Sequence, residues 1–410
     1  MTKVADPKLS GEGEKDFQWA KAHMGGLTML SEKYSRKKPL EGVKIGACLH
    51  VTKETSVLID ALLQAGAEVK LCGSNPLSTQ DDIAAYLSTR TDVWAWRGES
   101  TKDYGWCIRQ VLGTSPEQLI DDGADLTVTA HLDHVKGIVG GSEETTTGVM
   151  RLKALEADGK LAFPIIAVND AKTKSLFDNR YGTGQSTLDA VMRSTALLLA
   201  GMRVVVVGYG WVGKGVAMRA RGMGARVMVV EVDPVKALEA HLEGFDVASI
   251  GEAVKQGELF VTVTGQKNVV PYEAIEKMSD GAILANSGHF DVEVDVETLM
   301  SKAKSVREVR PNLDEVRLPN GRKVYLLGKG RLANLAAAEG HPPEVMQMSF
   351  AVQFLAAMML HNDHGSMEKR VYGVTREMDD EVARAALRSL GISIGTPTKE
   401  QLGYAKSWKL

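Results

Sequence analysis

One glycine-rich stretch constrains the fold of this chain more than any other. It begins with four consecutive valines, Val204–Val207, which are typical of a buried strand, and continues into Gly208, Gly210 and Gly213. A helical segment rich in alanine and methionine follows, and a second apolar run ends at Glu231. Strand, glycine turn, helix and strand in this order indicate a βαβ unit that binds a dinucleotide.

Each glycine of this turn has a physical role in dinucleotide binding. Gly208 permits the tight turn, Gly210 lets a pyrophosphate approach the backbone, and Gly213 lets the helix pack closely on the strand. The positive end of the helix dipole then faces the phosphates. Glu231 can accept both hydroxyls of an adenosine ribose and would repel a 2′-phosphate, so we predict NAD rather than NADP. A glycine turn without a ligand is the alternative, and the surrounding strand and helix pattern disfavours it.

Composition excludes several other classes of protein. The chain has 410 residues, more than one ordinary core accommodates, so two domains are expected. Its 49 basic and 52 acidic residues give a net charge of −3, which offers nucleic acid no attraction. Three cysteines without CxxC spacing disfavour a disulfide framework and a zinc site, and we expect no metal. No apolar leader and no uncharged run of about 18 apolar residues is visible, so we predict a cytoplasmic protein without membrane contact.

Apolar runs also alternate with helical segments through the first half of the chain. Candidate buried strands include residues 42–49, 67–72 and 164–168. We therefore predict the α/β fold class, with two doubly wound parallel-sheet domains, a substrate domain and a Rossmann NAD domain, joined by a hinge. Residues 345–361 are rich in methionine and alanine and are more apolar than a surface helix. We expect this segment to cross back to the first domain or to pack on another protomer.

Polar side chains cluster just after the predicted strands of the first half, where an open α/β sheet binds its ligand. They are His50, Thr52 and Glu54, then Asn75 and Ser78, then Asp121, Asp122 and Asp125. The first half is therefore predicted to bind a small molecule of its own. We assign residues 1–184, completed by 343–385, to a substrate-binding domain, 185–342 to the NAD-binding domain, and 386–410 to a short C-terminal tail.

Further charged patterns suit chemistry, although each also has a purely structural explanation. Residues 142–148 hold two adjacent carboxylates and three threonines, which either cap a helix or contact a ligand. The spacing of Lys174 and Asp178 would place both side chains on one face of a helix. An exposed salt bridge would explain the same spacing. Asp122 and its acidic neighbours could form a solvated turn, and His50 could be structural, although a nearby carboxylate favours a pocket.

Together these motifs resemble the S-adenosylhomocysteine hydrolase family over almost the whole chain, roughly residues 15–395. The matching motifs are HVTKET at 50–55, NPLSTQD at 75–81, WAWRGE at 94–99, DDGADLT at 121–127, SEETTTG at 142–148, KTKSLFDN at 172–179, the glycine turn, NSGHFD at 286–291, and GRLANL at 330–335 with GHP at 340–342. The resemblance implies reversible hydrolysis of S-adenosyl-L-homocysteine to adenosine and L-homocysteine, a reaction of the methyl cycle. It also implies a homotetramer with one tightly bound NAD in each protomer, and a cycle of 3′-oxidation, C4′ proton abstraction, elimination, water addition and re-reduction.

The resemblance assigns roles residue by residue. The implied catalytic residues are His50, Asp122, Glu144, Lys174, Asp178 and Asn179. Lys174, with Asp178 and Glu144, would act on the 3′-hydroxyl and would need a lowered pKa, while Asp122 and His50 would serve C4′ and the 5′ leaving group. The implied substrate contacts are Thr52, Glu54, Thr55, His289 and His341, with Glu54 accepting from the 6-amino group of adenine. The implied NAD contacts are Thr145, Thr146, Thr147, Gly208, Gly210, Gly213, Glu231, Asn286 and Asn334.

Some positions depart from the family pattern, and three alternative functions stay open. Thr183 and Lys236 replace a cysteine and an asparagine of many members, and the chain lacks their lysine and tyrosine tail, as the short form of the family does. An S-inosylhomocysteine hydrolase would bind hypoxanthine, whose 6-oxo group is an acceptor. Glu54 disfavours this function, because a carboxylate that faces another acceptor is left unpaired. An ordinary dehydrogenase would release NADH during turnover. A non-catalytic paralogue should have lost catalytic residues that are all present here.

Overall fold

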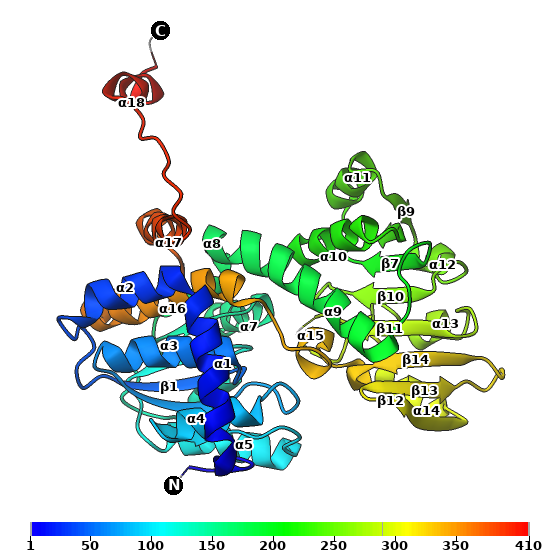
Figure 1. Cartoon of the computed structure of the whole chain (residues 1–410), viewed down its shortest axis with the longest axis horizontal. Helices are drawn as coiled ribbons and strands as arrows, with labels where there is room; N and C mark the ends of the chain where they lie inside the picture. The colour runs from blue at the N-terminus through cyan, green and yellow to red at the C-terminus, as the bar shows by residue number, and fades with distance from the viewer. Residues whose placement is uncertain (1, 289, 409–410) are drawn as a thin grey trace.

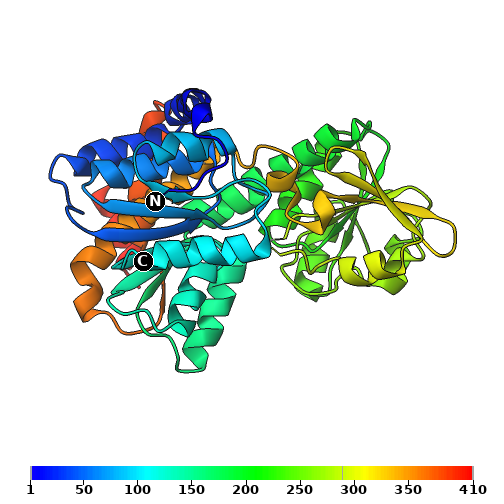
Figure 2. The same cartoon turned by 90° about the horizontal axis from the view of Figure 1, so that it is seen from below.

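The computed structural model describes residues 2–288 and 290–408 of the chain. It contains a seven-stranded and an eight-stranded sheet, which lie side by side in two lobes with helices packed on them (Figures 1 and 2). The first sheet is entirely parallel and the second is mostly parallel. The predicted fold class, two doubly wound α/β domains, is confirmed.

The first sheet is built almost entirely from the first half of the chain. Its strands are β1 (Lys44–Leu49), β2 (Glu68–Gly73), β3 (Asp92–Trp94), β4 (Gln118–Asp121), β5 (Gly140–Glu143), β6 (Ile165–Ala167) and β15 (Val371–Gly373), in the spatial order β15-β6-β5-β4-β1-β2-β3. The accompanying helices are η1 (Pro7–Leu9), α1 (Ser10–His23), α2 (Gly25–Ser35), α3 (Lys53–Gln64), α4 (Asp81–Ser88), α5 (Thr101–Leu112), α6 (Asp125–Leu132), α7 (Thr146–Ala157) and η2 (Val168–Asp170). The strand order changes direction at β1, which pairs with β2 on one side and β4 on the other, so a ligand crevice is expected beyond the ends of β1 and β4.

The second sheet carries the glycine turn. Its strands are β7 (Arg203–Val207), β8 (Arg226–Val230), β9 (Asp246–Ala248), β10 (Leu259–Thr262), β11 (Ala282–Asn286), β12 (Ser305–Arg310), β13 (Leu313–Arg317) and β14 (Lys323–Leu327), in the order β12-β13-β14-β11-β10-β7-β8-β9. Its helices are α9 (Thr183–Thr195), α10 (Trp211–Gly222), α11 (Pro234–Leu242), α12 (Ile250–Ala253), α13 (Tyr272–Ile275), α14 (Val296–Lys302), η4 (Gly328–Gly330) and α15 (Ala333–Ala336). The four valines of β7 are buried because parallel strands flank β7 on both sides.

Two segments connect the sheets. The first comprises α8 (Lys172–Lys174), the π-helix η3 (Ser175–Gly182) and α9. The second leads from α15 into α16 (Pro343–Asp363), which returns to the first sheet and continues through η5 (His364–Ser366) to β15, α17 (Arg376–Ser389) and α18 (Lys399–Lys406) (Figure 1). The expected return of the apolar segment is confirmed, because Phe350, Phe354 and Leu355 of α16 belong to the core against the first sheet.

In the described chain, one helical region, 343–366, is long and apolar enough to cross a membrane. Most of its apolar window, 78%, is buried inside the structure, as in a core helix. The domain limits at residues 184, 342 and 385 stay a prediction. They are consistent with the pairing of β15 with β6, the packing of α16 on the first sheet, and the packing of α17 on α2 and α16.

Candidate active site

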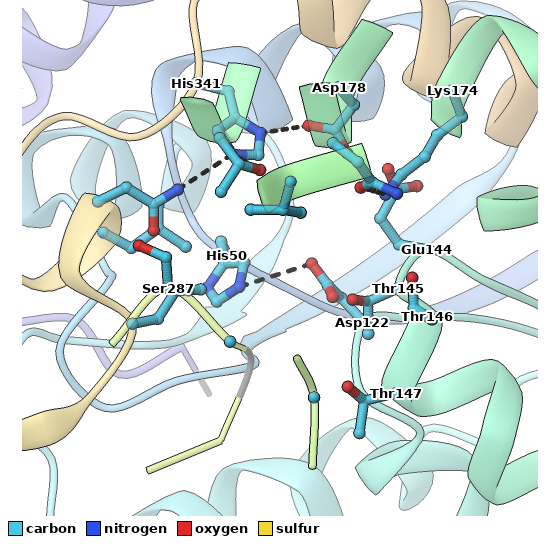
Figure 3. Close-up of a pocket in the computed structure, with 18 of the residues that line it drawn as sticks. His50, Asp122, Glu144, Thr145, Thr146, Thr147, Lys174, Asp178, Ser287 and His341 are labelled. Carbon is cyan, nitrogen blue, oxygen red and sulfur yellow. Dashed lines mark hydrogen bonds and ion pairs between the residues drawn. The ribbon is translucent and has the colours of Figure 1, made fainter. Parts of the chain in front are cut away.

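A cavity of about 340 Å³ lies where the carboxyl ends of the two sheets face each other (Figure 3). Residues that follow β1, β4 and β5 line it from the first sheet, and residues that follow β7, β10 and β11 line it from the second. The site therefore combines the ligand crevices of two open sheets. A small molecule bound by the first sheet would directly face a dinucleotide bound by the second.

Most of the predicted site residues line this cavity. They are His50, Thr52, Glu54, Thr55, Asp122, Glu144, Thr145, Thr146, Thr147, Lys174, Asp178, Asn179, Gly210, Asn334 and His341. Gly208, Gly213, Glu231 and Asn286 are not among the lining residues. His289 lies outside the described residues, so its predicted role cannot be placed.

The Lys174 ammonium is the centre of a buried polar cluster. Its side chain is 4% exposed, and Nζ lies 2.6 Å from Asp178 Oδ2 and donates to Asn179 Oδ1 at 2.9 Å. The π-helix η3 explains the second contact, because its wider turn brings a side chain five residues on beside Lys174. Burial alone would lower the pKa of Lys174, but the Asp178 and Glu144 carboxylates raise it above its ordinary value. The expected lowered pKa is therefore wrong for this arrangement, because two carboxylates stabilise the ammonium.

Glu144 is a carboxyl group of this cluster whose pKa lies near neutral pH. It follows β5 and is buried against α16. The Ser349 hydroxyl donates to Oε1, and Gln353 Nε2 donates to Oε2 at 2.7 Å. Burial raises the pKa of Glu144 to about 7, because the carboxylate loses its hydration. Glu144 can therefore both bind and release a proton under physiological conditions.

His341 completes the cluster on the side of the second sheet. His341 Nδ1 lies 2.5 Å from Asp178 Oδ1, and the Asn334 amide donates to Nε2 at 3.0 Å (Figure 3). Because Nε2 accepts from the Asn334 amide, the ring proton lies on Nδ1, and Nδ1–H donates to Asp178. Burial would lower the pKa of His341, but the Asp178 carboxylate raises it. Asp178 therefore serves Lys174 and His341 together, and these two groups lower the pKa of Asp178 although burial opposes them.

A second pair, His50 and Asp122, faces this cluster. These residues follow the neighbouring parallel strands β1 and β4, so their side chains meet at the carboxyl end of the sheet. His50 Nε2 lies 3.6 Å from Asp122 Oδ2 (Figure 3). His50 Nδ1 lies 2.7 Å from the Ser78 hydroxyl. A histidine held by a hydroxyl on one side and facing a carboxylate on the other is suited to acid–base exchange with a bound molecule.

Glu54 has a buried carboxylate oxygen to which no described group donates a hydrogen bond. Thr52 caps α3 by accepting from the Thr55 amide, and this places Glu54 in the first helical turn, facing the cavity. Glu54 is 1% exposed, and its Oε1 has no hydrogen-bond partner among the described residues. A buried carboxylate oxygen without a donor is costly, so Oε1 indicates a donor group on the ligand.

The glycine turn fits a dinucleotide. Gly208 has a φ of +107°, which favours glycine, and a Cβ on Gly213 would lie 2.0 Å from the Gly208 carbonyl oxygen. A Cβ on Gly210, at the N-terminus of α10, would meet nothing within 4 Å, which leaves room for a phosphate. Glu231 accepts from the Tyr209 amide at 2.7 Å, so it also holds the turn. Near the cavity, Asn334 Oδ1 is buried without a hydrogen-bond partner in the described chain, and a ligand donor would satisfy it.

Replacing Gly213 with alanine is expected to destabilise the protein by about 2 kcal/mol or more, because the new methyl would collide with backbone rather than with a movable side chain. Thermal unfolding and the NAD content of the purified variant measure this effect. Gly222 is the matched control at the other end of α10, where a Cβ meets nothing within 4 Å. There alanine should be neutral or slightly stabilising. Equal unfolding midpoints for the two variants would contradict the prediction.

Sequence reasoning missed several contacts of the site. Trp211, Thr264, Ser287, Met346 and Phe350 also line the cavity. The first three follow strands of the second sheet, and that position was a usable signal. Nothing local marks the contacts made by α16.

Asn286 is predicted to contact NAD, but it has a structural function here. Its amide donates to the carbonyl oxygens of Gly288, Phe290 and Gly330, and its Oδ1 accepts from the Thr262 hydroxyl. Asn286 thus fixes the loop after β11 by hydrogen bonds. Its contact with NAD stays a prediction.

Comparison with known proteins identifies close relatives of this chain. The family model described as S-adenosyl-L-homocysteine hydrolase matches residues 1–135, and the model described as its NAD binding domain matches residues 179–340. Adenosylhomocysteinases of Sulfurisphaera tokodaii and Aeropyrum pernix are 53% and 54% identical over 99% of both chains. S-inosyl-L-homocysteine hydrolase of Methanocaldococcus jannaschii is 50% identical over 100% of this chain and 99% of its own.

Among solved structures, a dipicolinate synthase chain from Bacillus halodurans is similar, with a TM-score of 0.50. It is 13% identical, and the match covers 80% of this chain and 99% of that chain. At this identity the similarity concerns the fold alone.

Proposed function

This chain belongs to the S-adenosyl-L-homocysteine hydrolase family, and we propose that it hydrolyses S-adenosyl-L-homocysteine reversibly to adenosine and L-homocysteine. It is an enzyme, and its cofactor is NAD. The observation that supports the proposal most strongly is the pair of acid–base clusters around one cavity. The buried cluster of Lys174, Asp178 and Glu144 and the pair of His50 and Asp122 are both present between a substrate-type crevice and an NAD-type crevice.

Bound NAD supplies a reversible two-electron oxidation of the ribose 3′ carbon, which makes the hydrogen on C4′ acidic. Gly208, Gly210 and Gly213 would hold its pyrophosphate, and Glu231 its adenosine ribose. Thr145, Thr146, Thr147 and Asn334 would hold the end that faces the substrate. Held in this way, the cofactor would present its reactive end to the first sheet, as the chemistry requires.

Lys174 and Glu144 exchange the proton of the 3′-hydroxyl. Lys174 is an ammonium in this structure, so it must first release a proton before it can accept one. Glu144 can receive that proton because its pKa is about 7. Asp178 holds the Lys174 amine at the site, and Asn179 orients it through a hydrogen bond of 2.9 Å. The 3′-hydroxyl proton then passes to the neutral amine.

Asp122 and His50 act on the other side of the ribose. The Asp122 carboxylate removes the proton from C4′, and His50 supplies a proton to the departing homocysteine sulfur. In the second half of the cycle His50 takes a proton from the water that adds at the 5′ carbon, and the C4′ proton is returned. Their separation of 3.6 Å leaves each side chain a face for its own substrate atom.

Glu54 gives the base specificity. The exocyclic 6-amino group of adenine is a donor and would fill the open Oε1 acceptor. Hypoxanthine presents an oxygen acceptor there, which would leave both groups unpaired at a cost of about 1–3 kcal/mol. S-inosyl-L-homocysteine hydrolase activity is the second candidate, and the likeness to the Methanocaldococcus jannaschii hydrolase makes it worth a direct test.

The test compares both substrates with the purified holoenzyme. A thiol reagent reports homocysteine, and absorbance reports NADH. We expect faster thiol release from the adenosine compound than from the inosine compound, without net NADH. Faster cleavage of the inosine compound would overturn the base assignment. Thiol release from neither substrate, or NADH accumulation during turnover, would overturn the proposed reaction.

Replacing Ser349 with alanine should move the acid limb of the kcat/KM profile to higher pH by about 0.5–1 unit. The Ser349 hydroxyl donates to Glu144 and stabilises its ionised form, so losing this bond raises the pKa of Glu144 above 7. Glu144 must be ionised to accept a proton, so the variant enzyme loses activity at a higher pH than the unmodified enzyme as the pH falls. Ser366 of η5, which is exposed, is the control position for alanine. An unshifted limb in S349A would mean that another group sets it.

Two broader properties complete the proposal. We propose a homotetramer, as the family resemblance implies, and, from the composition, a cytoplasmic protein that binds no nucleic acid or membrane. The small-molecule substrate follows from the family itself. Mass measurement in solution tests the oligomeric state directly.

A further inference from the structure

Lys53 is a buried cation beside the predicted base pocket. It occupies the first turn of α3, next to Glu54, and is 8% exposed. Lys53 Nζ lies 3.6 Å from Glu54 Oε1, the oxygen without a hydrogen-bond partner in the described chain, and 3.1 Å from Glu339 Oε2. Lysine is rarely buried unless it is paired, so this position requires its two carboxylates.

The second partner, Glu339, belongs to the segment that carries His341. The Glu339 side chain is 59% exposed, and its Oε1 lies 3.1 Å from Arg193 Nη2 of α9. Gln80 Nε2 donates to the Glu339 carbonyl at 3.3 Å, and Arg97 donates to the Ala336 carbonyl at 2.6 Å. Segment 336–341 is thus attached to the first domain by side chains from three different places in the chain.

We propose that Lys53 is a specificity-determining positioning residue: its ammonium fixes the charge and orientation of Glu54 as the acceptor for the 6-amino group of adenine, and its bond to Glu339 ties the base pocket to the segment that carries His341. The inference rests on the proposed function. It goes beyond that function because Lys53 is absent from the cavity lining and acts through two carboxylates.

The charged groups around Glu54 support this role. Burial raises the pKa of Glu54, whereas Lys53 on its own helix and His341 from the opposite segment lower it. Lys53 in turn is stabilised as a cation by Glu54, Glu339 and Asp16 of α1. Without the ammonium, the pKa of Glu54 rises further above its ordinary value. A protonated Glu54 would present a hydroxyl, which can donate to the 6-oxo group of hypoxanthine and no longer suits adenine.

The experiment measures nucleoside binding by calorimetry with adenosine and inosine as probes, on the holoenzyme and on K53M. We expect the Kd of adenosine to rise about tenfold in K53M and that of inosine to change less, so that the preference falls about tenfold. The loss for adenosine should be largest at low pH and should shrink as the pH rises through the raised pKa of Glu54.

Two further variants separate charge from packing. K53R keeps the cation and should restore most of the adenosine preference at all pH values. Lys38 is exposed, and its own partner is the nearby Glu41, so K38M removes the same charge without touching the pocket. K38M should leave both Kd values unchanged.

The proposal is overturned if K53M weakens both nucleosides equally, or if K53R behaves as K53M does, since either result makes Lys53 a purely structural residue. A K53M protein that does not fold leaves the K53R comparison and the pH dependence of binding as the decisive readouts. Failure of the proposed function is distinguishable, because it would be seen as absent thiol release by the unmodified enzyme, whatever its nucleoside preference.

Discussion

Replacing Lys174 with methionine is expected to lower kcat for thioether hydrolysis by about 10³-fold, because positioned proton transfer contributes factors of roughly 10²–10⁴. Methionine retains much of the apolar stem but removes the ammonium that contacts Asp178 and Asn179. The 3′-hydroxyl then has no amine to accept its proton. Thiol release in steady state measures the loss, and the NAD content of the purified variant is determined in parallel, since it should stay close to that of the unmodified enzyme.

Two other substitutions show whether the effect comes from proton transfer. K174R retains a cation for Asp178, so its folding should be preserved, but a guanidinium does not release its proton near neutral pH. K174R should therefore be almost as inactive as K174M. Lys172 is the matched control, because it lies in the same short helix and is exposed, and K172M should retain activity. A K174R enzyme within tenfold of the unmodified enzyme would assign the proton transfer to another group.

Local patterns predicted the parts of this site that are contiguous in sequence. The turn from Gly208 to Gly213 could be identified because each glycine has its own steric reason within one strand–helix unit. The Lys174–Asp178 contact followed from the spacing of one helical turn. The contact with Asn179 did not, because a π-helix produces it, and a π-turn leaves no trace in a pattern of apolar residues.

Long-range contacts set the electrostatics, and these could not be predicted. Ser349 and Gln353 donate hydrogen bonds to the buried Glu144 carboxylate, yet they lie on an apolar helix far along the chain, where two polar residues gave no signal. The family resemblance requires Lys174 to have a lowered pKa. The pKa is raised because Asp178 and Glu144 both approach the amine, and how many carboxylates surround a buried cation depends on tertiary packing.

In the second sheet, the position of a site residue could be predicted better than its role. Asn286 has the expected position at the end of β11, but its amide is fully used in holding three backbone carbonyls. Position after a strand predicts nearness to a site, whereas the direction of a side chain depends on which local carbonyl groups compete for it. The pairing of Lys53 with Glu339 shows the same limit, because the two residues belong to distant segments.

Replacing Asp122 with asparagine is expected to lower kcat for thiol release by about 10³-fold and to abolish exchange of the C4′ hydrogen of adenosine with solvent deuterium. The amide has nearly the shape of the carboxylate but cannot accept the C4′ proton. Because His50 would keep a polar neighbour, adenosine affinity should change less than about threefold. Mass spectrometry of adenosine incubated with the holoenzyme in D₂O measures the exchange, and calorimetry measures the affinity.

The exchange measurement isolates the proton transfer at C4′ from every later step. Asp133 is the matched control, since it is an exposed acidic residue paired with Arg109 in the same domain, and D133N should exchange normally. If His50 were the base at C4′, D122N would continue to exchange deuterium while H50N would not. If Asp122 is the base, H50N should still exchange deuterium into C4′. It should release thiol slowly, because it lacks the imidazole that protonates the departing sulfur. The two variants therefore have opposite patterns under the two assignments, and the 3.6 Å contact between these side chains makes the comparison necessary.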